Sequence, residues 1–263
     1  MTHHLSAPCS KQQTHIVFRI SLLLVLLFGY KEDTAQRKPT PQEAAAITKA
    51  AGAVNDIVER FADSNWQMSA GGIAPAEYYS VKIRPNEPIN TTPFQGDWDF
   101  TIRTGSPLYH EKIQPYIVKI SSPPTDPNDK KAWDEYMHST DKIKGLQHVY
   151  VEAVINRLSV FVNPLKGGND DLKIPGCYFS YKQPGGEVPV IGTDYQLPSY
   201  VLAFGNWKNT KKESDGEYMF PFVHKPGTPY IENIVIILSG NEERIKELLQ
   251  KTDWNKINEG LTL

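Results

Sequence analysis

Cys177 is the one cysteine that follows residues 1–35, and a cysteine thiolate is a strong nucleophile. A catalytic cysteine needs a lowered pKa and a histidine close to it in space. The candidate partners are all distant in sequence and lie in no local signature: His110, His138, His148 and His224. Cys177 lies between Pro175-Gly176 and Tyr178-Phe179, and a strand cysteine beside aromatic residues is typically a small buried apolar side chain. We therefore expect a buried, inert thiol.

Asp134 and His138 are the best-spaced metal-ligand types in the chain. They are four residues apart, so on a helix they would share a face and could both reach one metal ion. A third ligand is not identifiable, and the twin-histidine motif of zinc-dependent hydrolases is absent. A solvated helix face explains both residues equally well, so we expect neither a metal nor a cofactor.

Two pairs of carboxylates, Asp97/Asp99 and Asp170/Asp171, are of the kind that a glycosidase uses. Acid–base catalysis on a sugar requires two carboxyl groups opposed across the substrate, which adjacency in sequence does not supply. The chain also lacks a nucleophile elbow, a phosphate-binding loop and a dinucleotide fingerprint. No motif in the sequence therefore predicts a reaction.

Aromatic residues are the one feature that suggests a ligand. The chain contains 5 tryptophans and 13 tyrosines. Flat rings exposed on a sheet can stack on sugars or apolar molecules, whereas buried rings simply fill the core of an α+β domain. Core filling is the commoner cause, so from the sequence alone we expect these rings to be buried in the core.

The charge balance excludes one class of partner. With 28 basic and 30 acidic residues, the chain carries a formal net charge of −2, without the basic surplus of a nucleic-acid-binding protein. Of its 2 cysteines, one lies in the leader, so the rest of the chain cannot form an intrachain disulfide. A conventional apolar core must supply its stability.

Residues 20–30 indicate export. They are uncharged and apolar, follow Arg19 and precede the polar residues 31–33, which is the three-part pattern of a secretory signal. Eleven residues span about 16 Å as a helix, half of a bilayer core. We expect cleavage after Ala35, although Asp33 fits the cleavage rule poorly, and an uncleaved anchor is the alternative. That anchor would be the only membrane contact, because Tyr30 stands where a lipoprotein has its cysteine.

Two helices are predicted at the ends of the mature chain. Thr40-Pro41-Gln42-Glu43 is a capping box, and apolar residues recur every three or four positions up to about Ala62. Near the C-terminus, Ile234–Leu238 is apolar without alternation, as in a strand covered on both faces. Asn241 then caps a helix whose apolar side is Ile245, Leu248 and Leu249, and a final turn follows around Trp254.

Between these helices the sequence predicts mainly short strands. Alternating apolar and polar residues place them at Tyr78–Ile83, Trp98–Arg103, Tyr116–Ile120, His148–Val162, Cys177–Tyr181, Tyr200–Phe204 and Tyr218–Val223. The alternation changes parity at Asn156-Arg157, which requires a bulge or bend. A further helix is expected over Asp129–Lys142 with Trp133, Tyr136 and Met137 on its apolar side, and a solvated hairpin tip over Lys208–Gly216.

This order of elements predicts an α+β fold, with a mainly antiparallel sheet and the N- and C-terminal helices packed on one face. We expect residues 36–263 to form a single domain after the signal of residues 1–35. The sequence favours an exported, non-enzymatic protein, periplasmic or secreted, that binds a small molecule or an envelope protein. The alternative is a hydrolase whose site is assembled from scattered residues, with Cys177, His138 and His224 as candidates.

Export is directly testable. When a C-terminally tagged copy is expressed in bacteria, fractionation should recover it outside the inner membrane or attached to its outer face, because residues 20–30 direct it there. A matched copy with Leu24 replaced by Arg should stay inside, since a charge interrupts the apolar run. Full-length chain that is soluble in the cytoplasm would contradict the prediction.

Overall fold

The computed structural model describes residues 35–76, 80–83, 90–92, 95–161, 172–183, 198–214, 216–223 and 229–262. The chain divides into two compact units, Met1–Ala35 and Gln36–Leu263, and the second holds nearly all of the described residues. The expected export signal lies outside the described residues, apart from its last residue. Within the ranges given above, no helix is both long and apolar enough to cross a bilayer.

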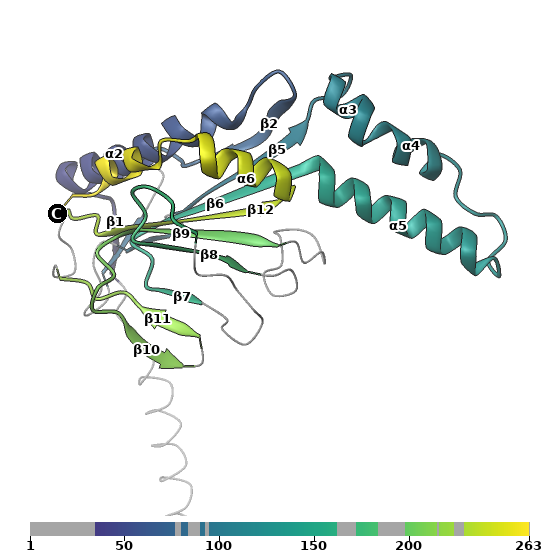
Figure 1. The fold of residues 1–263 in the computed structure, drawn as a ribbon. Helices are drawn as coiled ribbons and strands as arrows, with labels where there is room; N and C mark the ends of the chain where they lie inside the picture. Colours follow the sequence, from purple (N-terminus) through teal and green to yellow (C-terminus); the bar gives the residue numbers. More distant parts are fainter. Residues whose placement is uncertain are drawn as a thin grey trace, which may run out of the picture. The chain divides into compact units, whose positions relative to one another are not determined.

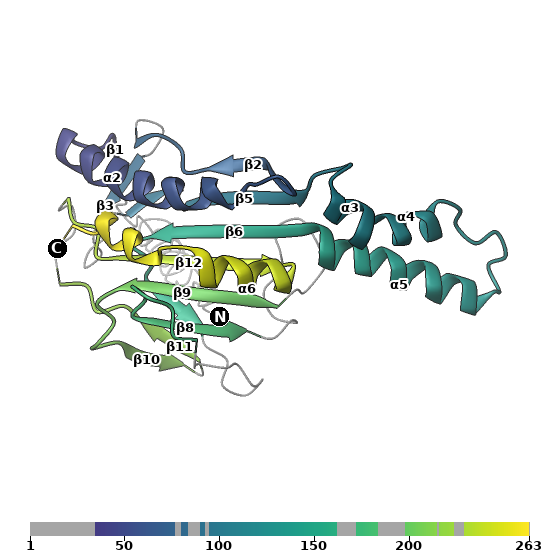
Figure 2. The same cartoon turned by 45° about the horizontal axis from the view of Figure 1, so that its top comes forward.

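A six-stranded antiparallel sheet organises the described residues (Figures 1 and 2). Its strands, in spatial order, are β2 (Trp66–Gly72), β5 (Gln95–Ile102), β6 (His148–Ile155), β12 (Asn233–Gly240), β9 (Ser199–Gly205) and β8 (Phe179–Gln183). All residues of β12 are buried, and Ile236 pairs with Ala153 of β6 on one side and Leu202 of β9 on the other. The prediction of a strand covered on both faces is confirmed.

The two terminal helices cover one face of this sheet. These are α2 (Pro41–Val58), continued by the short 3-10 helix η1 (Glu59–Phe61), and α6 (Glu242–Lys251), followed by η4 (Trp254–Gly260). Figure 1 shows α2 and α6 on the same side of the strands. Ile47, Leu248 and Trp254 are buried in one cluster with Phe100 and Leu202 of the sheet. The predicted α+β class, with both terminal helices on one face, is confirmed.

Both helix starts are formed as the sequence predicts. Thr40 accepts from the Glu43 amide, and the Glu43 carboxylate accepts from the Thr40 amide at 2.8 Å. Arg37 adds a bidentate ion pair to Glu43 at 2.5 and 2.6 Å, which compensates for the burial of that carboxylate. Asn241 caps α6 by accepting from the Arg244 amide at 2.9 Å. These contacts fix where each helix meets the sheet.

A second, smaller sheet lies against the other face of the large one. It contains β10 (Lys211–Ser214), β11 (Glu217–Met219) and β7 (Ser159–Phe161), in that order. Val160 and Phe220 pack there with Val235 of β12 and Trp207, which forms a second buried cluster. The sheet β1 (Ala35–Arg37), β3 (Ser80–Ile83) and β4 (Asn90–Thr92) completes the described strands.

The predicted parity change at Asn156-Arg157 is a bend that sends the chain from one sheet to the other. Asn156 has a φ of 52°, in the left-handed region that asparagine tolerates better than most residues. Its amide oxygen accepts from the Glu232 backbone at 2.8 Å, and its amide nitrogen donates to the Tyr230 carbonyl at 2.9 Å. The chain therefore leaves β6 at Ile155 and enters β7 at Ser159.

The strand expected at Tyr116–Ile120 is wrong. These residues belong to helix α4 (Gln114–Ile120), which follows α3 (Pro107–Lys112). Four β-branched or aromatic residues within five positions resemble a strand, but the longer window has a helical period: the core-contacting residues are Leu108, Tyr109, Ile113, Tyr116, Ile117 and Ile120. Ser106 caps α3 with Pro107 in its first turn, a helix-start signal that the short window excluded.

Other boundaries differ from the prediction. The expected helix is α5 (Lys130–Gln147), and its Met137, expected to face inward, is 51% exposed, whereas Ser139 and Ile143 are buried. Strand β2 carries little alternation and was not predicted. The expected solvated tip at Lys208–Gly216 contains β10, which pairs with β11.

Leu248 tests how far the C-terminal helix contributes to the core. Leu248→Ala should lower the free energy of unfolding by about 2–5 kcal/mol, because the truncation removes buried surface and leaves a cavity against the sheet. Gln250→Ala is the control: it is exposed on the same helix and should change that free energy by less than about 0.5 kcal/mol. Denaturant titration measures both. Equal effects would mean that α6 does not contribute to the core.

Candidate functional site

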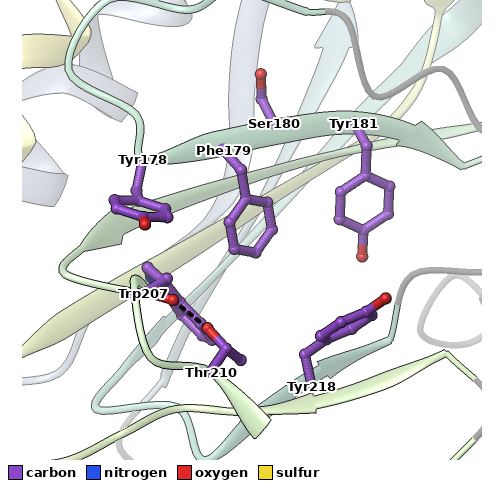
Figure 3. Close-up of a pocket in the computed structure, with 7 residues that line it drawn as sticks. All are labelled: Tyr178, Phe179, Ser180, Tyr181, Trp207, Thr210 and Tyr218. Atoms are coloured by element: carbon purple, nitrogen blue, oxygen red, sulfur yellow. Dashed lines mark hydrogen bonds between the residues drawn. The ribbon is translucent and has the colours of Figure 1, made fainter. Parts of the chain in front are cut away.

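A cavity of about 320 Å³ opens between the end of the large sheet and the small sheet (Figure 3). The described residues that line it are Tyr178, Phe179, Ser180, Tyr181, Trp207, Thr210 and Tyr218. Figure 3 shows the rings of Phe179 and Tyr181 descending from β8 toward Trp207 and Tyr218, while the Ser180 side chain points away. Aromatic rings therefore converge on this space from three separate segments of the chain.

The alternation of β8 produces one wall of this cavity. Successive strand side chains point to opposite faces, so Phe179 and Tyr181 share the face that Ser180 leaves. Their rings stack at 6.2 Å between centroids. Ser180 donates its hydroxyl to the Leu172 carbonyl on the opposite side of the strand. The two rings are thus aimed into the cavity by backbone geometry.

Trp207 anchors the opposite wall. Its indole nitrogen donates to the Phe204 carbonyl at 3.1 Å, and the ring is 2% exposed. It meets Phe179 edge-on at 5.4 Å between centroids and Phe220 at 4.6 Å. Thr210 donates its hydroxyl to the Trp207 carbonyl, shown dashed in Figure 3. These contacts hold the ring in place before any ligand arrives.

Tyr178 forms the accessible rim. It is 49% exposed, although its backbone amide is held by the Ala203 carbonyl at 2.8 Å. The lining combines tyrosine and threonine hydroxyls with apolar ring faces, and none of these lining residues carries an ionisable acid or a cation at neutral pH. Such a surface suits a neutral molecule with a flat apolar face.

A polar cluster lies elsewhere on the same face of the large sheet. Asp97 and Asp99 of β5 share the face that is opposite to the helices, and the register pairs them with Glu152 and Tyr150 of β6. His148 Nδ1 lies 3.0 Å from Asp99 Oδ1. An ionised carboxylate can only accept, so this nitrogen is the donor.

Burial and hydrogen bonding separate the acidities of these carboxyl groups. Burial raises the pKa of Asp97 and of Glu152; for Glu152 the charge of Arg157 opposes this and that of Asp97 adds to it. Burial alone would also raise the pKa of Asp99, but hydrogen bonds from His148 and Ser69 lower it overall. The Ser69 hydroxyl donates to Asp99 at 2.8 Å. The two carboxyl groups of β5 therefore have pKa values shifted in opposite directions.

The described cysteine and histidine candidates have separate surroundings: His110 contacts Gln114 on α3 and α4, and His148 contacts Asp99. Cys177 is partly buried against the core, and burial raises the pKa of its thiol to about 12, so almost no thiolate exists at neutral pH. Asp134 and His138 are exposed on α5. In the part of the chain that the structure describes, no three histidine, cysteine or acidic side chains could hold a metal ion together. His224 and the pair Asp170/Asp171 lie outside the described residues.

Some residues of both features can be singled out from the sequence alone, but their arrangement in space cannot. The surplus of aromatic residues suggested ring stacking, but not which rings would meet. The pair Asp97/Asp99 was recognised as carboxylates of interest, whereas Tyr150 and Glu152 were missed. The signal that could have found them is the alternation of polar residues along β6, which places His148, Tyr150 and Glu152 on one face.

Comparison with protein-family models, with curated proteins and with solved structures finds no match to this chain. Its function is therefore inferred from the geometry of the described residues. Two features qualify as sites: the aromatic cavity at Tyr178 and the polar cluster around Asp99. They differ in chemistry, since the first offers apolar surface and the second offers titratable groups.

Asp99 gives the cluster a pH signature. Its folded-state pKa is lowered, so the carboxylate contributes stability above its unfolded pKa and this contribution is lost as the pH falls through the folded value. Asp99→Asn should therefore lower the free energy of unfolding by about 1 kcal/mol at pH 7, and by progressively less in acid. Denaturant titrations across this pH range measure the difference.

Asp134→Asn is the matched control, because that carboxylate is exposed on α5. It should leave the free energy of unfolding unchanged within about 0.5 kcal/mol at both ends of the pH range. A loss in Asp99→Asn that is the same at pH 7 and in acid would show that the side chain contributes by packing alone.

Proposed function

We propose that this protein is an exported, non-enzymatic binding protein that holds a small neutral molecule with a flat apolar face in the cavity at Tyr178. The observation that carries the proposal is the convergence of Tyr178, Phe179, Tyr181, Trp207 and Tyr218 on one uncharged space. Ligand cavities are typically lined by apolar and aromatic side chains with a few polar groups that orient the ligand.

The size of the cavity suits a ligand of one or two rings. At about 320 Å³ it lies at the lower end of the range of roughly 300–1,000 Å³ that ligand pockets occupy. Its walls are already fixed by the Trp207 and Ser180 hydrogen bonds, so binding loses little side-chain entropy. A preformed aromatic cavity of this kind favours a ligand that presents an apolar face to the rings.

The described lining residues carry no charge at neutral pH, and this supports a neutral ligand. An ion placed in this cavity would lose water without gaining an opposite charge, because the lining residues are aromatic side chains, a serine and a threonine. Aromatic faces carry negative potential and repel anions in particular. The tyrosine hydroxyls can instead pair with hydroxyl groups at the edge of a neutral ring.

The polar cluster is too far away to act on the same small molecule. In the strand order, β6 and β8 are separated by β12 and β9. Strands lie about 4.8 Å apart, so three steps separate the two features by about 14 Å. The two features therefore do not act together on one small molecule. The hydrolase alternative rests on Cys177, and burial raises the pKa of that thiol to about 12, which favours the binding protein.

Export belongs to the same proposal and rests on the apolar run of residues 20–30. A binding protein outside the inner membrane would meet neutral nutrients and wall fragments in its surroundings. The fractionation experiment with the Leu24→Arg control tests this part independently of the ligand.

Binding should discriminate between neutral and anionic ligands of one shape. We expect benzyl alcohol to bind at least tenfold more tightly than benzoate, which has the same ring but carries a charge. Tyr178→Ala should weaken the binding of benzyl alcohol about tenfold through lost stacking and lost burial. Ligand-observed saturation-transfer NMR, with titration to obtain Kd, measures both.

Tyr136→Ala is the control variant, since Tyr136 lies on α5 against Trp133 and does not line the cavity. It should leave the Kd for benzyl alcohol unchanged. Preference for benzoate, or equal weakening by the two tyrosine variants, would contradict a neutral ligand at Tyr178.

A further inference from the structure

A second cavity adjoins the first at Tyr178. It measures about 510 Å³ and is lined by Gly176, Cys177, Tyr178, Gly205, Asn206, Asn258 and Leu261. Tyr178 lines both cavities, and its half-exposed ring stands where one meets the other. A ligand longer than one ring that stacks on Tyr178 can therefore reach into both spaces.

The walls of the second cavity are held rigidly. Gly176 and Gly205 have φ values of 84° and 102°, which side-chain-bearing residues rarely adopt. A Cβ at Gly205 would lie 2.2 Å from the Glu232 carbonyl oxygen, and one at Gly176 would lie 2.8 Å from the Asn255 Cα. The Asn258 amide donates to the Gly176 carbonyl at 3.0 Å. This cavity, like the first, exists before a ligand binds.

The two cavities offer different chemistry. The first presents ring faces, whereas the second presents the amides of Asn206 and Asn258 beside the small Gly176 and Gly205. Asn206 is exposed, and its amide oxygen accepts from the Lys208 backbone at 3.2 Å. Among the described residues of the two linings, no side chain is charged at neutral pH.

A neutral sugar chain matches this combination. Each sugar ring has an apolar C–H face, which stacks on an aromatic ring, and an edge of hydroxyl groups, which pair with amides and hydroxyls. A single apolar ring, by contrast, would leave the amide cavity unused. Resting on the proposed function and deepening it, we propose that the ligand is a neutral oligosaccharide that spans both cavities across Tyr178.

Length dependence follows from this arrangement. Once the first sugar ring is bound, the second ring is held close to the neighbouring cavity at a high local concentration. The contacts of the second ring therefore add to the affinity without a second loss of translational and rotational entropy. Sugars of three or four units should therefore bind at least tenfold more tightly than the single sugar of the same series. Isothermal titration calorimetry measures this gain, with three series of one to four units: the cellobiose series and the maltose series, which both begin with glucose, and the N-acetylglucosamine series.

Asn206→Trp isolates the second cavity. The residue is exposed, so the substitution is compatible with folding, and the added ring fills space that the proposal assigns to sugar. It should bring the affinity for the longer sugars down to that of the single sugar, whose own affinity should not change. Lys208→Trp introduces the same bulk two residues away, outside both linings, and should leave the length dependence intact.

The outcomes separate this inference from the function on which it rests. The oligosaccharide proposal is supported if the affinity rises with the number of sugar units, Asn206→Trp removes this rise and Lys208→Trp keeps it. If benzyl alcohol binds in a Tyr178-dependent way but no sugar series gains affinity with length, the inference is overturned and the binding function stands. If neither benzyl alcohol nor any sugar binds at Tyr178, both fail.

Discussion

The structure depends on the burial of β12 on both of its faces. Ile234, Ile236 and Leu238 pack beneath the helices, while Val235 and Ile237 face the opposite side. An apolar strand with only one covered face would expose a row of β-branched side chains to water, at a cost of about 25 cal/mol for each Å². The fold therefore needs a layer on each side: the terminal helices on one, and the small β7-β11-β10 sheet on the other.

The second layer also creates the cavity. The bend at Asn156 carries the chain out of the large sheet into β7, and the small sheet brings Tyr218 opposite the rings of β8. The small sheet covers the aromatic end of the face, with Trp207 and Phe220 filling its interior, while the polar side chains of β5 and β6 stay partly exposed beyond it. The same covering that buries Val235 thus leaves an uncharged, ring-lined space at the end of the sheet. Structure and proposed ligand site have one physical origin.

A structural feature could be predicted from the sequence when the residues that determine it lie close together in the chain. The capping box at Thr40, the unbroken apolar run of β12 and the parity change at Asn156 each lie within a few residues, and all three are confirmed. The strand expected at Tyr116–Ile120 failed because a five-residue window cannot separate β-branched helix residues from strand residues. The site could not be predicted, because Phe179, Trp207 and Tyr218 come from three segments that only the sheet order brings together. Likewise, strand register alone places Glu152 beside Asp97.

The central claim is that the cavity at Tyr178 is the ligand site. Amide chemical-shift mapping on the labelled protein tests it most directly, with cellotriose, maltotriose and tri-N-acetylchitotriose as separate titrants. The account predicts that at least one of them shifts residues 176–181 and 205–210 together with Tyr218, and leaves Asp97, Asp99 and His148 in place. Shifts centred on the Asp99 cluster would move the site to the polar part of the sheet. Shifts at neither place, with any of the three sugars, would contradict a sugar-binding cavity at Tyr178.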